Sequence, residues 1–83
     1  MKLLYFAWVR ERIGLSEEEI VLPAGVETVR DLLHHLRARG DGYAAALQHP
    51  EAIRVAINQE HVKHGERLDG AREIALFPPM TGG

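Results

Sequence analysis

The sequence predicts an α+β domain in which one main helix packs across one face of a small mixed β-sheet. Two observations predict this fold class. Residues 29–39 combine the apolar spacing of a helix with capping residues, whereas the other apolar segments are short and bounded by turn residues. The chain has 83 residues, which is enough for a single core. We therefore expect one domain spanning residues 1–83.

The N-terminal half is expected to hold two strands followed by the helix. Residues 2–9 are a run of aromatic and aliphatic side chains that predicts a strand with two apolar faces, as in a central strand. Residues 18–22 predict a second strand, in a hairpin with the first. Thr28 is a suitable N-cap for the helix and Gly40 a suitable C-cap. Apolar residues follow the spacing i, i+3, i+4, i+7 at Val29, Leu32, Leu33 and Leu36.

The C-terminal half is expected to complete the sheet. Residues 43–48 predict a short helical turn, residues 53–57 a third strand, and Val62 lies in a short extended piece. Residues 73–77 predict the last strand, which two prolines terminate. A compact arrangement of this order places the first and last strands side by side and parallel at the centre of the sheet. This arrangement is the β-grasp, or ubiquitin-like, fold.

One helix of about 16 Å can cover only one face of such a sheet. Alternation along the first strand then places Phe6 and Trp8 on the opposite face, beside Phe77. Exposed apolar clusters of this kind mark protein contacts, so we interpret the three residues as a partner interface. The alternative is that the connecting segments 41–52 or 60–70 fold over this face.

Composition and charge limit the possible partners. The chain is 46% apolar and 27% charged with a net charge of −2, which argues against a nucleic-acid-binding protein. No apolar run is long enough to cross a bilayer, so we expect no membrane partner. The N-terminal apolar segment runs into charged residues without a small-residue cleavage site, which argues against a signal peptide. We therefore expect a cytoplasmic protein.

The histidines and an acidic run are the remaining polar candidates. His34 and His35 are adjacent on the helix and do not converge, whereas His61 and His64 have a His-x-x-His spacing on a predicted turn. Without cysteine or a regular carboxylate pattern, we expect no metal site and interpret these histidines as solvated or hydrogen-bonded. The acidic run at 17–19 is interpreted as a solvated strand edge, with an acidic docking patch as the alternative.

The C-terminus is the most distinctive segment. Gly82 and Gly83 carry no side chain, so residues 78–83 are expected to form a slender flexible tail that ends in a carboxylate. Such a tail could enter a tunnel too narrow for other residue pairs. The alternative is an incidental frayed end.

Four segments carry a resemblance to a known family. The tail, residues 77–83 (Phe-Pro-Pro-Met-Thr-Gly-Gly), resembles that of the small, sulfur-carrying subunits of molybdopterin synthase. Residues 4–11, 55–59 and 68–75 resemble further segments of the same family, so the similarity covers nearly the whole chain. The sequence departs from the family pattern at Met80 and at Trp8. It also departs at His61, because an apolar contact residue is expected at that position.

The resemblance implies a β-grasp fold and a function. An E1-like partner would use ATP to adenylate the carboxylate of Gly83, and sulfur transfer would convert it to a thiocarboxylate. The tail, with Thr81 and Gly82, would enter the active site of the large synthase subunit and deliver sulfur to a pyranopterin precursor, in a complex that is typically a heterotetramer. The implied interface with the partner comprises Phe6, Trp8, Phe77, Pro78, Pro79 and Met80.

The absence of an ATP-binding loop and of cysteine is consistent with a carrier protein that is not an enzyme on its own. A carboxylate is a poor electrophile, so it must be activated before sulfur can attack it. The chain has no Gly-x-x-x-x-Gly-Lys-Ser/Thr loop to hold ATP. We therefore expect another protein to activate the carboxylate, and we expect this chain to bind no cofactor. Without cysteine, the C-terminus is the only evident place for covalent sulfur. The alternatives are a related carrier for thiamine or transfer-RNA thiolation, a protein tag joined by an isopeptide bond, or a plain interaction module.

Overall fold

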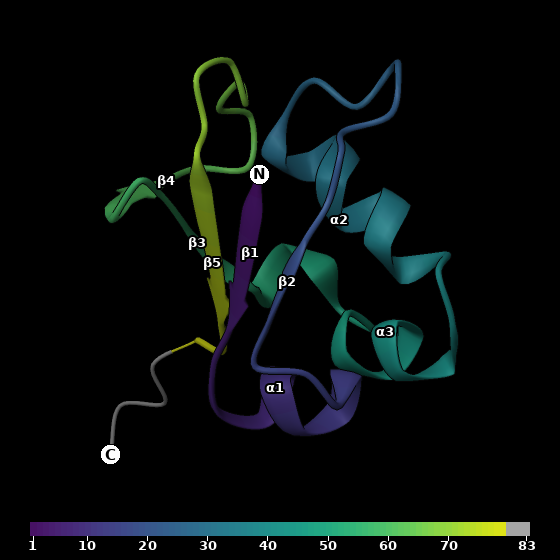
Figure 1. Ribbon diagram of the computed structural model, residues 1–83. Helices are drawn as coiled ribbons and strands as arrows, with labels where there is room; N and C mark the ends of the chain where they lie inside the picture. The colour runs from purple at the N-terminus through teal and green to yellow at the C-terminus, as the bar shows by residue number, and fades with distance from the viewer. Residues whose placement is uncertain (80–83) are drawn as a thin grey trace.

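The computed structural model describes residues 1–79, which form a five-stranded mixed sheet with helices packed against it (Figure 1). The strand order is β2-β1-β5-β3-β4. At the centre, β1 (Lys2–Tyr5) pairs in parallel with β5 (Glu73–Phe77). The predicted β-grasp arrangement is therefore confirmed.

The outer strands are antiparallel to their neighbours. β2 (Glu17–Glu19) pairs with β1, and β3 (Arg54–Ile57) pairs with β5. β4 (Glu60–Val62) forms a hairpin with β3 through a two-residue turn in which Asn58 and Gln59 have positive φ. The Asn58 side chain accepts hydrogen bonds from the backbone N–H groups of Arg72 and Glu73, which ties this turn to the start of β5.

The main helix, α2 (Val29–Arg37), begins as predicted. The Thr28 hydroxyl accepts from the backbone N–H of Asp31, and the Asp31 carboxylate accepts from the backbone N–H of Thr28, a reciprocal capping box. The helix ends two residues before the predicted boundary at 39. Its last turn tightens there, since Ala38 and Arg39 donate to carbonyls three residues earlier.

The prediction of one strand across residues 2–9 is wrong beyond Tyr5. Phe6 is still extended, and α1 (Ala7–Ile13) follows and ends at Gly14 with φ of 90°. A short apolar run cannot distinguish a strand from a buried helix turn, because both bury residues at these spacings. Trp8 consequently lies in α1 and packs against the core, with the Arg12 guanidinium 4.2 Å from the centre of its ring.

Two further boundaries differ from those predicted. The second strand was expected at 18–22, but β2 stops at Glu19 and the side chain of Val21 is 93% exposed. The short helical turn expected at 43–48 is α3 (Asp41–Ala46), and a single 3₁₀ turn, Pro50–Ala52, follows it. The strands expected at 53–57, around Val62 and at 73–77 are confirmed to within one residue as β3, β4 and β5.

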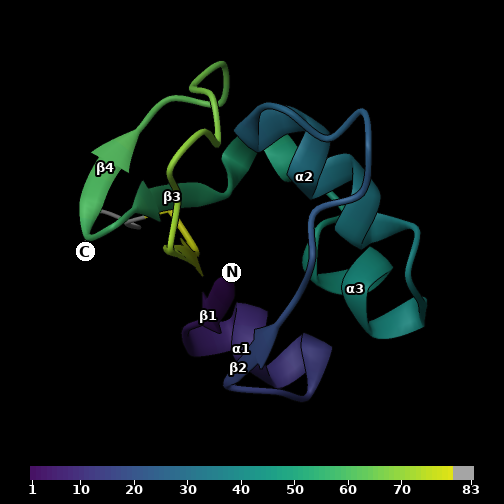
Figure 2. The ribbon, with the colours of Figure 1, turned by 45° about the horizontal axis from the view of Figure 1, so that its top comes forward.

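The helices and the sheet enclose one apolar core. Figures 1 and 2 show α2 and α3 on the same side of the sheet, and α3 packs against both α1 and α2. Within residues 1–79, no helix has the length and apolar character needed to cross a membrane. The largest fully buried side chains are Leu3, Tyr5, Val9, Val29, Leu32, Leu33, Leu36, Leu47, Val55, Ile74 and Leu76.

A half-buried carboxylate connects the sheet to the helical layer. Glu18 Oε2 accepts hydrogen bonds from the hydroxyl groups of Tyr5 and Tyr43, each at 2.6 Å, and Glu18 Oε1 lies 3.2 Å from an Arg39 guanidinium nitrogen. Burial alone would raise the pKa of Glu18, but the bonds from Tyr43 and Tyr5 and the charge of Arg39 together lower it. Burial and the same carboxylate raise the pKa of both tyrosines. The acidic run at 17–19 is therefore a solvated edge only at Glu17 and Glu19.

Glu18→Gln is expected to destabilise the fold by about 1–2 kcal/mol at pH 7, because Arg39 loses its counter-charge and the tyrosines lose a charged acceptor. The folded-state pKa of Glu18 is depressed, so its contribution is present above its unfolded pKa of 4.5 and is lost as pH falls through the folded value. Urea unfolding between pH 7 and pH 3 would show a smaller loss of stability on acidification in the variant. Glu17→Gln, an exposed control, should follow the wild type. Identical acid slopes for Glu18→Gln and the wild type would contradict this account.

A second prediction concerns the contact between α1 and α3. A Cβ atom at Gly42 would lie 2.7 Å from the carbonyl oxygen of Arg12, and backbone atoms cannot move aside cheaply. Gly42→Ala should therefore lower the free energy of unfolding by about 1–3 kcal/mol. The matched control is Gly65→Ala, where a Cβ meets nothing within 4 Å. Equal melting temperatures for the two variants would show that α1 and α3 can separate without cost.

Candidate functional site

The strand register defines two faces of the sheet, because residues directly opposite one another share a face. The face toward the helices carries the buried side chains of Leu3, Tyr5, Val55, Ile74 and Leu76. The residues between them point to the other side. We call this side the open face, and it comprises Leu4, Phe6, Arg54, Ala56, His61, Ala75 and Phe77.

The open face is apolar at its centre and is not covered by the connecting segments. Residues 41–52 form α3 and the 3₁₀ turn, and α3 packs on α1 and α2. Residues 63–70 lie on the helical side, where Leu68 is buried in the core and the Glu66 carbonyl accepts from the backbone N–H of Val29. Of the segments 41–52 and 60–70, only β4 (60–62) contributes to the open face, through the His61 ring against Phe77, and the rest of both segments does not fold over it.

Two aromatic residues, Phe6 and Phe77, lie on the same face where β1 and β5 end. The backbone N–H of Phe6 donates to the carbonyl of Leu76, so Phe6 continues the parallel pairing by one residue. Phe6 is 47% exposed and Phe77 is half-buried. The prediction that Phe6 and Phe77 share the uncovered face is confirmed. The predicted place of Trp8 on this face is wrong, because α1 turns that residue toward the core.

The His-x-x-His pair is split between two environments. The ring of His61 packs edge-on against Phe77, with ring centres 5.1 Å apart, on the open face. His64 Nε2 instead lies 2.7 Å from the carbonyl oxygen of Ile53. In the part of the chain that the structure describes, no group of three or more His, Cys, Asp or Glu side chains could hold a metal ion.

The tail begins beside this aromatic pair. Pro78 and Pro79 directly follow β5 and are half-buried. Their fixed φ and missing N–H groups end the sheet pairing at the centre of the sheet rather than at its edge. The expectations for Met80, Thr81, Gly82 and Gly83, including a flexible tail, lie outside the described residues and stay predictions.

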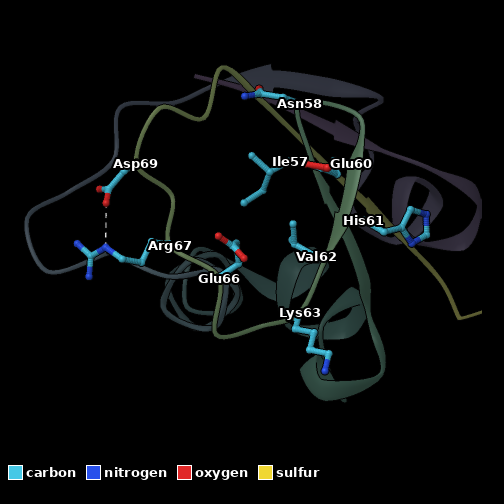
Figure 3. Close-up of a pocket in the computed structure, with 9 residues that line it drawn as sticks. All are labelled: Ile57, Asn58, Glu60, His61, Val62, Lys63, Glu66, Arg67 and Asp69. Carbon is cyan, nitrogen blue, oxygen red and sulfur yellow. Dashed lines mark hydrogen bonds and ion pairs between the residues drawn. The ribbon is translucent and has the colours of Figure 1, made fainter.

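A hollow lies between the β3–β4 hairpin and residues 66–69 (Figure 3). It has a volume of about 570 Å³, and Ile57 and Val62 form its apolar part. At its rim, Arg67 Nε donates to the carboxylate of Asp69 at 2.8 Å. His61 also lines this hollow, and Figure 3 shows its ring pointing away from the other labelled side chains.

Comparison with known proteins decides the family. The family model described as the ThiS family matches residues 3–83. The chain belongs to the ThiS family. Among curated members, the molybdopterin synthase sulfur carrier subunit of Escherichia coli (strain K12) is 39% identical over the whole chain and 99% of that protein. The human molybdopterin synthase sulfur carrier subunit is 31% identical, over the whole chain and 93% of that protein.

Solved structures give the same result for this ThiS-family chain. A structure described as a putative molybdopterin converting factor, subunit 1, from Pyrococcus furiosus has a TM-score of 0.72 and 30% identity, over 95% of each chain. The crystal structure of SAMP1 from Haloferax volcanii has a TM-score of 0.71 and 30% identity, over 100% of this chain and 98% of that one. The fold and the sequence therefore agree over the full domain.

The exposure of Phe77 gives a test of the open face in the isolated ThiS-family chain. Phe77→Asp should leave the circular dichroism spectrum unchanged and lower the melting temperature by only a few degrees, since the new carboxylate remains in water. Leu76→Asp, one residue away on the buried face, should prevent folding because an unpaired carboxylate would enter the core. Unfolding of the Phe77→Asp chain would show that this face is part of the core.

Proposed function

We propose that this chain is the sulfur carrier subunit of molybdopterin synthase and that the carboxylate of Gly83 is its reacting group. The observation that carries the proposal is the full-length similarity to sulfur carrier subunits, at 39% identity for the Escherichia coli protein. An uncovered apolar face beside the root of a Gly-Gly tail supports it, because a carrier must dock its body while its terminus reaches into a partner.

The proposed reaction begins on an E1-like partner. A carboxylate oxygen of Gly83 attacks the α-phosphate of ATP, and pyrophosphate leaves. A sulfur nucleophile from a donor then displaces AMP from the acyl carbon, which leaves a thiocarboxylate at Gly83. Activation is needed because a carboxylate resists nucleophilic attack, whereas the acyl-adenylate offers a good leaving group. ATP is thus used by the partner, and this chain binds no cofactor.

The thiocarboxylate then acts as a nucleophile. A thiocarboxylate is largely ionised at neutral pH and attacks for the reason that a thiolate does. In the active site of the large synthase subunit it would transfer its sulfur to a pyranopterin precursor, and water would restore the carboxylate of Gly83. Thr81 and Gly82 would enter this site with the tail, directly before the reacting Gly83. The catalytic acid–base groups are proposed to belong to the large subunit, so this chain is not an enzyme alone.

Docking is proposed to use the open face and the root of the tail. Apolar patches with an aromatic centre are typical of interfaces that form by burying such side chains. Trp8 is excluded from this set because it lies in α1. We infer that the synthase is a cytoplasmic heterotetramer of small and large subunits. The proposed contacts are Phe6, Phe77, Pro78, Pro79 and Met80.

Removal of Gly83 tests the reacting group. The shortened chain should fold as the wild type does, bind the large subunit, and give no molybdopterin from the precursor in a reconstituted synthase. The wild type, after incubation with the E1-like partner, ATP and a sulfur donor, should gain the mass difference between sulfur and oxygen in intact-mass spectrometry. Thr81→Ser serves as a conservative control with retained activity.

Full molybdopterin formation by the shortened chain would overturn the assignment of Gly83. A wild-type chain that never gains sulfur would overturn the carrier function itself.

A second candidate function is protein modification. The similarity to SAMP1 favours it, because that protein is described elsewhere as a small archaeal modifier protein. The same Gly83 adenylate would then react with a lysine amine, form an isopeptide bond and release AMP. Denaturing gels of cell extracts distinguish the two functions, since a modifier gives covalent conjugates that a carrier does not.

A further inference from the structure

Two cationic or ionisable side chains lie on the open face where the tail leaves the sheet. Arg54 is directly opposite Phe77 in the β3–β5 pairing, and His61 is opposite Ala56 in the β3–β4 pairing. Arg54, His61 and Pro79 line the same hollow, which has a volume of about 380 Å³. Arg54 and His61 are therefore polar residues at the margin of an otherwise apolar face.

Neither side chain is neutralised within residues 1–79. Arg54 is exposed and makes no ion pair there, and His61 is exposed with its ring against Phe77. The other ionisable groups that line the hollow are Glu51 and His64. The Glu51 carboxylate faces His49 at 3.9 Å, and Nε2 of His64 is engaged by the carbonyl of Ile53. Arg54 and Glu51 are thus the two side chains of opposite charge that line the hollow, and the Arg54 guanidinium has no ion-pair partner within residues 1–79.

A partner that covers the open face would remove the Arg54 guanidinium from water. Removing a guanidinium from water without a counter-charge costs several kcal/mol, which would oppose docking through Phe77. A carboxylate offsets this cost well, because its two oxygens match the guanidinium fork. The imidazole of His61 beside it offers a ring N–H as a further hydrogen-bond donor.

We propose that the large subunit inserts an aspartate or glutamate side chain into this hollow, between Arg54 and His61 and beside Phe77. This inference rests on the proposed function, because it presumes that the large subunit covers the open face. The carboxylate would fix the register of the two proteins at the root of the tail. Arg54 and His61 are thus positioning and specificity residues, while the reaction takes place at Gly83.

The charge of Arg54 predicts how binding responds to salt. Arg54 attracts the partner carboxylate, whereas Glu51, which lines the same hollow, opposes it. Salt weakens the pairing with Arg54 because the charges at the rim are screened.

Calorimetric titration of the full chain with its large subunit tests the proposal, at low and high sodium chloride. Arg54→Gln should weaken binding about 5–20-fold at low salt and lose much of the salt dependence. Arg72→Gln, an exposed arginine at the opposite end of β5, is the matched control and should change the dissociation constant by less than about 2-fold.

The outcomes separate this inference from the proposed function. If Phe77→Asp abolishes binding while Arg54→Gln binds as tightly as the wild type, the docking face stands and the carboxylate inference is overturned. If Phe77→Asp binds normally, the proposed docking face itself is wrong. Added inorganic phosphate, at matched ionic strength, should not affect binding; competition by phosphate would show that the hollow takes a free anion instead of a partner side chain.

Discussion

The parallel pairing of β1 with β5 at the centre of the sheet determines where the tail begins. Because the first and last strands are neighbours, the chain leaves the sheet from its middle, where Phe6 and Phe77 lie on the same face. A C-terminal strand at an edge would begin the tail farther from the centre of the open face. In the proposed function, this topology would place the root of the tail beside the docking face.

The sequence was sufficient to predict those elements whose signals lie within a few neighbouring residues. The capped helix α2, the Asn58-Gln59 turn and the proline-terminated strand β5 each carry their own signal, and the central strand pair followed from connectivity. The faces of β5 also follow from alternation, so the position of Phe77 was predictable. The similarity of the tail to a known family supplied the proposed reacting group, which no folded contact in residues 1–79 would have indicated.

Other features could not be predicted because they depend on contacts far apart in the chain. The run from Phe6 to Val9 suits a strand or a helix equally, and only the packing of α1 against α3 selects the helix. Glu18 looked like a solvated strand residue, since its hydroxyl partner on Tyr43 comes from a distant helix. The hollow at Arg54 and His61 likewise requires the registers of two strand pairs.

The acidic edge of the sheet has a consequence for the chain before it meets a partner. β2 is only three residues long and exposes Glu17 and Glu19, which pair with Lys2 and with the N-terminal amine. A short edge strand that carries charged side chains is a poor template for a further strand. This edge therefore disfavours pairing between copies of the chain, whereas the apolar side chains of the open face lie elsewhere on the sheet.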